Sequence, residues 1–153
     1  MSTVDVSFEV RCARLPRDYG YALYRALADA LDWLEEDAGA GVHPLHGTTA
    51  ADDALLLGPR GRLMLRLAED RVEQALALAG HRLDVGSGLE VGPGRVRTLM
   101  PYATVYSHFV STGAGDEAAF LGEAAAQLRT AGLPERMIPG RAHAAATPEG
   151  ELR

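Results

Sequence analysis

Two histidines, His43 and His46, stand close together in the stretch GVHPLHGTTA, residues 41–50. Imidazole has an ordinary pKa of about 6.5, so it can accept or donate a proton near neutral pH. A zinc site of the HExxH kind needs two histidines on one helical face, and Pro44 prevents a helix here. Neither a cysteine nor a group of carboxylates lies beside the pair. Two interpretations remain open: acid–base catalysis, or a solvent-exposed loop in which the histidines have no chemical role.

Arginine supplies every one of the 15 Lys and Arg residues in this chain. Its planar guanidinium group can form two parallel hydrogen bonds to a phosphate. A GC-rich genome would favour arginine as well, so composition alone does not decide. Arg60, Arg62 and Arg66 fall in and after an expected turn, where they form either a phosphate-binding edge or an ordinary solvated face.

Tyrosines supply further candidates at two places. Tyr24 lies near the start of a predicted helix but off its leucine stripe, so it either points toward His43 or packs at the edge between helix and sheet. Tyr102, Tyr106 and His108 share one face of an expected strand. They would stack on nucleic-acid bases there, or form the interface between two lobes.

These residues need a scaffold, and the first half of the chain predicts one βαββαβ unit. The expected elements are a strand over 4–11, a helix over 19–37 capped by Asp18, a hairpin with arms 54–57 and 62–67, a helix over 69–79, and a strand pair over 83–91. The first strand alternates apolar and polar residues, and the first helix carries a stripe of leucines at 23, 27, 31 and 34. This order of elements is typical of a ferredoxin-like fold.

The pattern begins again after Pro93-Gly94. A long strand is expected over 96–112, a helix over 117–131, and an extended segment over 136–146 that can pair with whatever follows Pro148-Glu149-Gly150. We therefore predict an α+β protein with tandem ferredoxin-like βαββαβ units, the second incomplete at the C-terminus. The lobes would span 1–93 and 94–153.

Composition bounds the remaining possibilities. The 153 residues are 47% hydrophobic, with a net charge of −6, which argues against avid nonspecific binding to nucleic acid. Cys12 is the single cysteine, so no internal disulfide and no CxxC zinc site can form. No apolar run reaches the length of about 18 residues that a membrane span needs, and MSTVDVSFEV lacks the features of a signal peptide. We expect a cytoplasmic protein without a membrane partner.

Four stretches in order, LPRDYGYALYRALADAL, GVHPLHG, LLLGPRGRLMLRL and LAGHRLDVG, carry a family resemblance. Together with two ferredoxin-like (RAMP/RRM-like) lobes and a histidine after the first helix, they resemble the RAMP superfamily of CRISPR-associated proteins. The similarity is to its small repeat-processing endoribonucleases of the myxobacterial (MYXAN) subtype. It covers nearly the whole chain.

The resemblance implies cleavage of precursor CRISPR RNA within its repeats, without a metal or other cofactor. A ribose 2′-OH attacks the adjacent phosphate, leaving a 2′,3′-cyclic phosphate and a 5′-OH. His43 would be the general acid or base, assisted by His46 or Tyr24, with the arginines of the hairpin holding phosphate. The protein would remain on the repeat hairpin and join other subunits of a CRISPR effector complex.

Two other hypotheses remain open. In the first, the chain would be a non-catalytic subunit that binds repeat RNA. Its acidic charge and the lack of a glycine-rich basic segment within these residues favour this hypothesis. Alternatively, the chain would be a ferredoxin-like module outside RNA biology, since this fold hosts many functions.

Overall fold

The computed structural model describes residues 2–107, 110–142, 145–147 and 150–152. The chain divides into two compact units, Met1–Ala103 and Thr104–Arg153. The strand that contains residues 93 and 94, where the sequence places the boundary between lobes, continues unbroken to Thr98.

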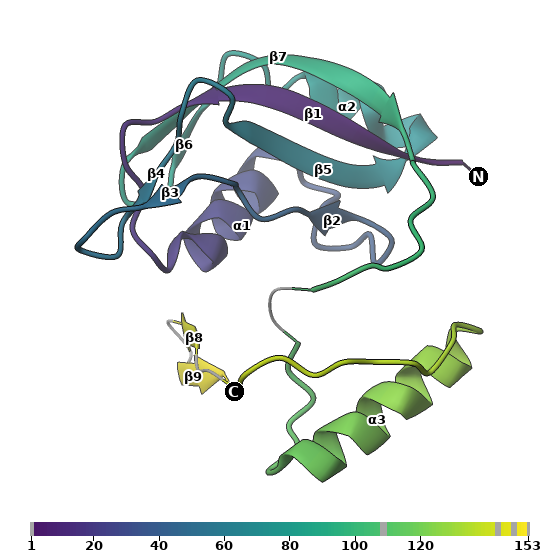
Figure 1. The fold of residues 1–153 in the computed structure, drawn as a ribbon. Coiled ribbons are helices and arrows are strands. Elements are labelled where there is room, and N and C mark those ends of the chain that lie inside the picture. The colour runs from purple at the N-terminus through teal and green to yellow at the C-terminus, as the bar shows by residue number, and fades with distance from the viewer. Residues whose placement is uncertain (1, 108–109, 143–144, 148–149, 153) are drawn as a thin grey trace. The chain divides into compact units, whose positions relative to one another are not determined.

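A curled five-stranded sheet forms the first unit (Figure 1). Its strand order is β2-β5-β1-β7-β6, and all pairings are antiparallel. The elements are β1 (Thr3–Arg11), α1 (Tyr19–Ala30), β2 (Gly41–Val42), β5 (Arg62–Ala68), the short η1 (Glu69–Arg71), α2 (Val72–Leu76), β6 (Arg82–Asp84) and β7 (Gly88–Thr98). Helix α1 connects β1 to β2, and α2 lies between β5 and the β6–β7 pair. The order β2-β5-β1-β7 is that of a ferredoxin-like fold, which confirms the predicted fold class.

The two faces of this sheet differ in character. The inner face of β1 is apolar and buried, and it packs with the predicted leucine stripe of α1 and with Ala75 and Leu78 from α2 and the residues after it. Both helices of the unit thus contribute to one core. The opposite face of the sheet is left to polar and charged side chains, among which Asp5 and Ser7 of the central strand are themselves buried.

Helix α1 is shorter than predicted. It ends at Ala30 instead of residue 37, because Leu31 leaves the helical region with φ −131° and ψ 87°. Turns follow, and they still bury both Leu31 and Leu34 in the core. The predicted cap is also wrong: Asp18 precedes the helix, but its side chain accepts no capping hydrogen bond.

The predicted hairpin between 54–57 and 62–67 is wrong in its pairing. Strand β5 pairs with β1 and β2, whereas β4 (Leu55–Leu56) pairs with β3 (Thr48–Thr49) inside the segment expected to be a loop. The tight turn itself does form, since the Gly61 amide donates to the Gly58 carbonyl at 2.8 Å. Leu55 forms two backbone hydrogen bonds with Leu15 instead, so a contact distant in sequence replaces the local hairpin.

The second unit contains helix α3 (Glu117–Thr130) and a hairpin of β8 (Ala145–Thr147) and β9 (Gly150–Leu152). The predicted helix over 117–131 is confirmed, and the Asp116 side chain caps it by accepting from the Ala119 amide at 2.9 Å. Pairing across Pro148-Glu149-Gly150 is confirmed as well. The tandem arrangement, with a second ferredoxin-like unit that is incomplete at the C-terminus, stays a prediction. Within the described ranges, no helix has both the length and the apolar composition required to cross a bilayer.

The strand predicted over 96–112 is wrong beyond Thr98. Residues 99–107 and 110–112 are not in a strand. Thr98 pairs with Val4, close to the start of β1. The described residues after Thr98 therefore have almost none of β1 left to pair with. An alternating pattern without a partner to pair with does not make a strand.

Candidate active site

The polar face of the sheet aligns side chains from neighbouring strands. Asp5 of β1 lies opposite Arg66 of β5 on one side and Arg97 of β7 on the other. Ser7 lies opposite Met64 and Arg95 in the next row. Residues directly opposite in an antiparallel pair point to the same face, so these rows form one continuous surface.

His43 extends this surface at the edge of the sheet. It follows β2, and its amide donates to the Met64 carbonyl at 2.9 Å, which continues the β2–β5 pairing by one residue. The His43 side chain is therefore on the same face as Met64 and Arg66. Its Nε2 atom lies 3.8 Å from Asp5 Oδ1, and the side chain is 35% exposed. The imidazole is thus open to a ligand and close to a carboxylate.

Asp5 and Arg66 form an ion pair with two hydrogen bonds on this face. Arg66 Nε donates to Asp5 Oδ1 at 2.9 Å and Nη2 donates to Oδ2 at 3.0 Å. This paired geometry fixes the guanidinium plane. The hydrogen bonds to Asp5 raise the pKa of Arg66, so it stays a cation. Because the Asp5 side chain is only 13% exposed, water competes little at its oxygens.

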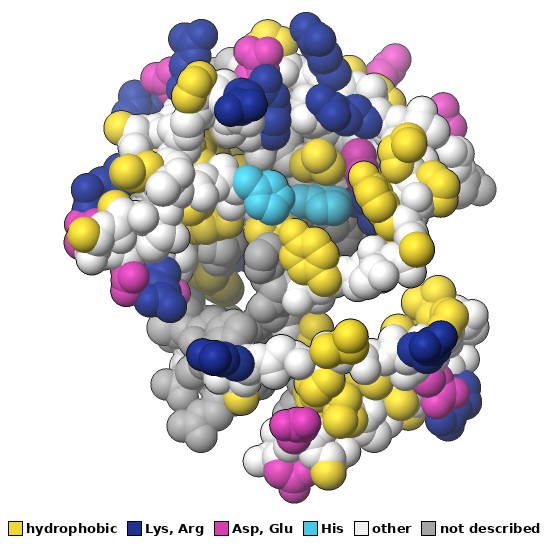
Figure 2. All heavy atoms as spheres, viewed as in Figure 1, with side chains coloured by type: hydrophobic (Ala, Val, Ile, Leu, Met, Phe, Trp, Pro, Cys, Tyr) yellow, Lys and Arg dark blue, Asp and Glu magenta, His cyan; other side chains and the backbone are white. Residues whose placement is uncertain are grey.

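The surroundings of His43 favour its neutral form. Burial lowers the pKa of His43, and the charge of Asp5 acts against this by raising it. Arg66 and His46 lower the pKa further. Figure 2 shows two histidine side chains next to each other, below several arginines over the sheet. Since the net shift is downward from 6.5, His43 is mostly a neutral base at pH 7.

Tyr19, at the start of α1, holds the loop that carries the histidines. The Leu45 amide donates to Tyr19 Oη at 2.8 Å, and Tyr19 Oη in turn donates to the Leu45 carbonyl at 3.3 Å. Burial raises the pKa of Tyr19 more than the Leu45 hydrogen bond lowers it, so the phenol keeps its proton at neutral pH. Leu45 itself is buried in the core. The loop is therefore anchored to helix α1 at the residue between its two histidines.

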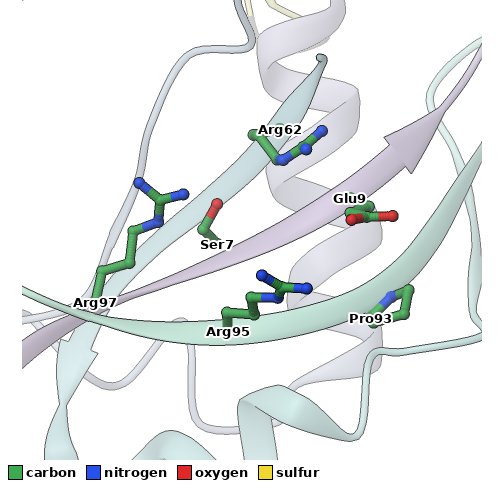
Figure 3. Close-up of a pocket in the computed structure, with 6 residues that line it drawn as sticks. All are labelled: Ser7, Glu9, Arg62, Pro93, Arg95 and Arg97. Atoms are coloured by element: carbon green, nitrogen blue, oxygen red, sulfur yellow. The ribbon is translucent and has the colours of Figure 1, made fainter. Parts of the chain in front are cut away.

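Three arginines surround a small hollow farther along the same face. Arg62 of β5 and Arg95 and Arg97 of β7 stand on both sides of Ser7 (Figure 3). Glu9 and Pro93 complete its lining. This arrangement gives the face a local positive charge that the acidic balance of the whole chain conceals.

The candidate ligands for a metal ion do not gather at this site. Across the described residues there is no group of three or more His, Cys, Asp or Glu side chains that could hold one. The chemistry available at the site is therefore that of one imidazole beside a fixed carboxylate–guanidinium pair, with a second, exposed imidazole nearby.

The comparisons with known proteins bear on this site. A family model described as Cas6 Crispr matches residues 4–153, almost the entire chain. The chain belongs to the Cas6 CRISPR family. Members of this family are CRISPR endoribonucleases that process and bind repeat RNA. No curated protein matches the chain.

Within this Cas6-family chain, the predicted site residues separate into groups. His43, His46 and Arg66 come together, while Arg62 joins the arginine hollow. Arg60 is exposed in the turn. Tyr24 is 37% exposed on α1, and its hydroxyl makes no hydrogen bond to any described residue. The tyrosine that contacts the histidine loop is Tyr19.

Tyr102 and Tyr106 fall in the segment between β7 and α3. Both are exposed, in a segment that forms no strand, so no flat sheet surface presents them side by side. Tyr102 belongs to the first compact unit and Tyr106 to the second. His108 lies outside the described residues. A contact of these tyrosines with RNA stays a prediction.

The sequence pattern did not identify four residues: Asp5, Arg95 and Arg97 on the polar face of the sheet, and Tyr19 at the start of α1. A signal existed for three of them. Asp5 occupies a polar position in an otherwise clearly alternating strand, and Arg95 and Arg97 flank Val96 in a second alternation. The partner of each could not be identified without the register of the strands.

We expect the substitution Arg66→Gln to raise the pKa of His43. It removes a nearby cation that lowers this pKa and leaves the carboxylate of Asp5, which raises it. The pKa of His43 is measured by following its Cε1–H signal by NMR as the pH changes. The exposed Arg60→Gln, away from His43, serves as the control and should leave the titration in place. A downward shift in Arg66→Gln would contradict this electrostatic account.

Proposed function

We propose that this Cas6-family chain is an endoribonuclease that cleaves precursor CRISPR RNA within its repeats without a metal ion. The observation that carries the proposal is the position of His43, half-exposed on the arginine-rich sheet face beside the Asp5–Arg66 pair. The four ordered stretches found in the sequence support assignment to the myxobacterial (MYXAN) subtype.

The cleavage step needs a base, an acid and a cation. Neutral His43 takes the proton of the ribose 2′-OH, whose oxygen then attacks the adjacent phosphorus while the bond to the 5′-oxygen breaks. Asp5, 3.8 Å from Nε2, stabilises the imidazolium that forms. The negative charge that develops on the phosphorane is stabilised by Arg66, whose guanidinium is held in place before the reaction begins.

A second group must protonate the 5′-oxygen as it leaves. His46 is our first candidate for this acid because it is exposed and close enough to influence the charge of His43. Tyr24, exposed on α1, is the second candidate. Arg60 and Arg62 would hold flanking phosphates, since neither is engaged with a carboxylate in the described part of the chain.

The test is incubation of the protein with the repeat RNA of its host in EDTA. We expect products that end in a 2′,3′-cyclic phosphate and a 5′-OH, because the attacking group belongs to the RNA itself. The same RNA with a 2′-deoxy nucleotide at the cleaved position is the control and should bind but stay intact. Cleavage of that control, or cleavage only after a divalent metal is added, would rule out this mechanism.

A second candidate function is that of a non-catalytic subunit that binds the repeat RNA within a CRISPR effector complex. The net charge of −6 favours it, because a free-standing RNA-binding enzyme usually carries a positive balance. Tight binding of the repeat RNA without any cleavage, at every pH tested, would favour this function over the nuclease.

A further inference from the structure

The hollow lined by Arg62, Arg95 and Arg97 has no function in the cleavage step described above. None of these three arginines forms an ion pair with a carboxylate among the residues the structure describes. Arg62 donates instead to the Gly61 carbonyl at 2.7 Å. Three guanidinium groups against the single carboxylate of Glu9 leave two net positive charges around the hollow. Guanidinium groups that line one hollow without a carboxylate partner can bind an anion.

The size of the hollow limits what it can hold. Its cavity volume of about 50 Å³ is far below the roughly 300–1,000 Å³ of pockets that enclose a small molecule. A nucleoside does not fit inside it, whereas a single tetrahedral anion does. At the base of the hollow, Ser7 is buried, and its hydroxyl can donate to such an anion.

The place of the hollow on the sheet separates it from the histidine. Arg95 lies on β7, and His43 pairs with the far edge of β5, with β1 between these two strands. Three inter-strand spacings of about 4.8 Å put the backbones roughly 14 Å apart. His43, Asp5 and Arg66 are not among the residues that line the hollow, so an anion inside it contacts a different set of side chains from the phosphate on which His43 would act.

From these observations we infer that the hollow is a subsite for one backbone phosphate of the bound RNA, distinct from the phosphate that is cleaved. This inference rests on the proposed function for the identity of the ligand as RNA. Arg95 and Arg97 hold the phosphate oxygens from β7 and Arg62 holds them from β5, with Ser7 beneath. The subsite anchors the strand at a fixed distance from His43 and so places the cleavage position.

The first experiment measures binding of repeat RNA that is blocked by a 2′-deoxy nucleotide at the cleavage site. Each phosphate in turn is replaced by an uncharged methylphosphonate. In the wild type we expect one linkage, not the cleaved one, at which the replacement weakens binding about tenfold. In the double variant Arg95→Ala/Arg97→Ala this effect should disappear, and the dependence of binding on salt should fall by a slope of about 0.7.

A matched control separates the subsite from general loss of charge. Arg11→Ala/Arg82→Ala removes the same two charges from the same sheet at residues outside the hollow. In this control variant, replacing the phosphate at the same single linkage should still weaken binding of the RNA. If both double variants keep this effect, or if both lose it, the subsite assignment is wrong.

The second experiment does not need RNA. Inorganic phosphate is titrated into the whole protein by calorimetry, and Glu9→Gln should tighten its binding because the only carboxylate of the hollow becomes neutral. Arg95→Ala/Arg97→Ala should abolish it. If phosphate binds in this way but repeat RNA does not, the proposed function fails and the anion site stands. If repeat RNA is bound and cleaved but Glu9→Gln leaves the binding of phosphate unchanged, the subsite fails and the proposed function stands.

Discussion

Replacing His43 by alanine is expected to slow cleavage of the repeat RNA by about 10²–10⁴-fold, the usual contribution of a positioned general base. Binding should change little, because the His43 side chain is neutral near pH 7 and adds little to the attraction of phosphate. Single-turnover cleavage rates and binding of the 2′-deoxy RNA measure the two effects separately.

The control for this prediction is His81→Ala. His81 is exposed in the turn before β6, and among the described residues only its backbone forms hydrogen bonds. Its removal should leave the cleavage rate unchanged. A His43→Ala variant that cleaves at the rate of the wild type would exclude His43 as the base, and a variant that no longer binds RNA would show that the residue contributes to affinity instead.

The second large effect concerns the packing beneath the site. Phe8 is fully buried in the centre of β1, opposite Gly94 of β7. We expect Phe8→Ala to lower the free energy of unfolding by about 3–5 kcal/mol, the usual cost of deleting a buried aromatic ring. This is a large share of the 5–15 kcal/mol that holds a typical domain together. Urea unfolding followed by circular dichroism measures it.

Gly94 gives this prediction a sharper form. A Cβ atom at this position would lie 2.6 Å from Phe8 Cε1 and 2.7 Å from Leu76 Cδ2, so Gly94→Val should destabilise the protein by about 1–3 kcal/mol through overpacking. In the Phe8→Ala background the ring is gone, and the same substitution should cost less or restore stability. Strict additivity of the two losses would mean that the side chains do not share this space.

The sequence predicted best the features that depend on a residue's near neighbours. Alternation identified β1, and a spacing of three or four residues identified the leucines of α1, because burial of one face imposes these periods. The helix over 117–131 was predicted from its alanine-rich composition instead. Each of these segments carries its own signal, whatever it later packs against.

Features that depend on distant partners could not be predicted. Strand β2 has two residues, Gly41 and Val42, which is too short for any period to appear. Leu55 binds Leu15 instead of its expected hairpin partner, and β7 stops where β1 begins. Pairing of this kind is fixed by the register of the whole sheet.

The same reason limited the prediction of the site. His43 and the arginines could be named from their chemistry and from a family resemblance, but Asp5 lies 61 positions from Arg66 in sequence. Only the register of β1 against β5 brings the two together. Tyr19 lies at the start of the first helix, and its hydrogen bonds to Leu45 have no counterpart in the sequence pattern.

The hydrogen bonds between Tyr19 and Leu45 couple the opening of the histidine loop to the unfolding of helix α1. A loop of this length would ordinarily open by itself many times before a domain unfolds. Here the buried leucine and the phenol must separate first, and both belong to the interior packing of the unit. Amide hydrogen exchange at Leu45 should therefore be as slow as in helix α1, and on heating the loop should open at the temperature at which the tertiary structure is lost.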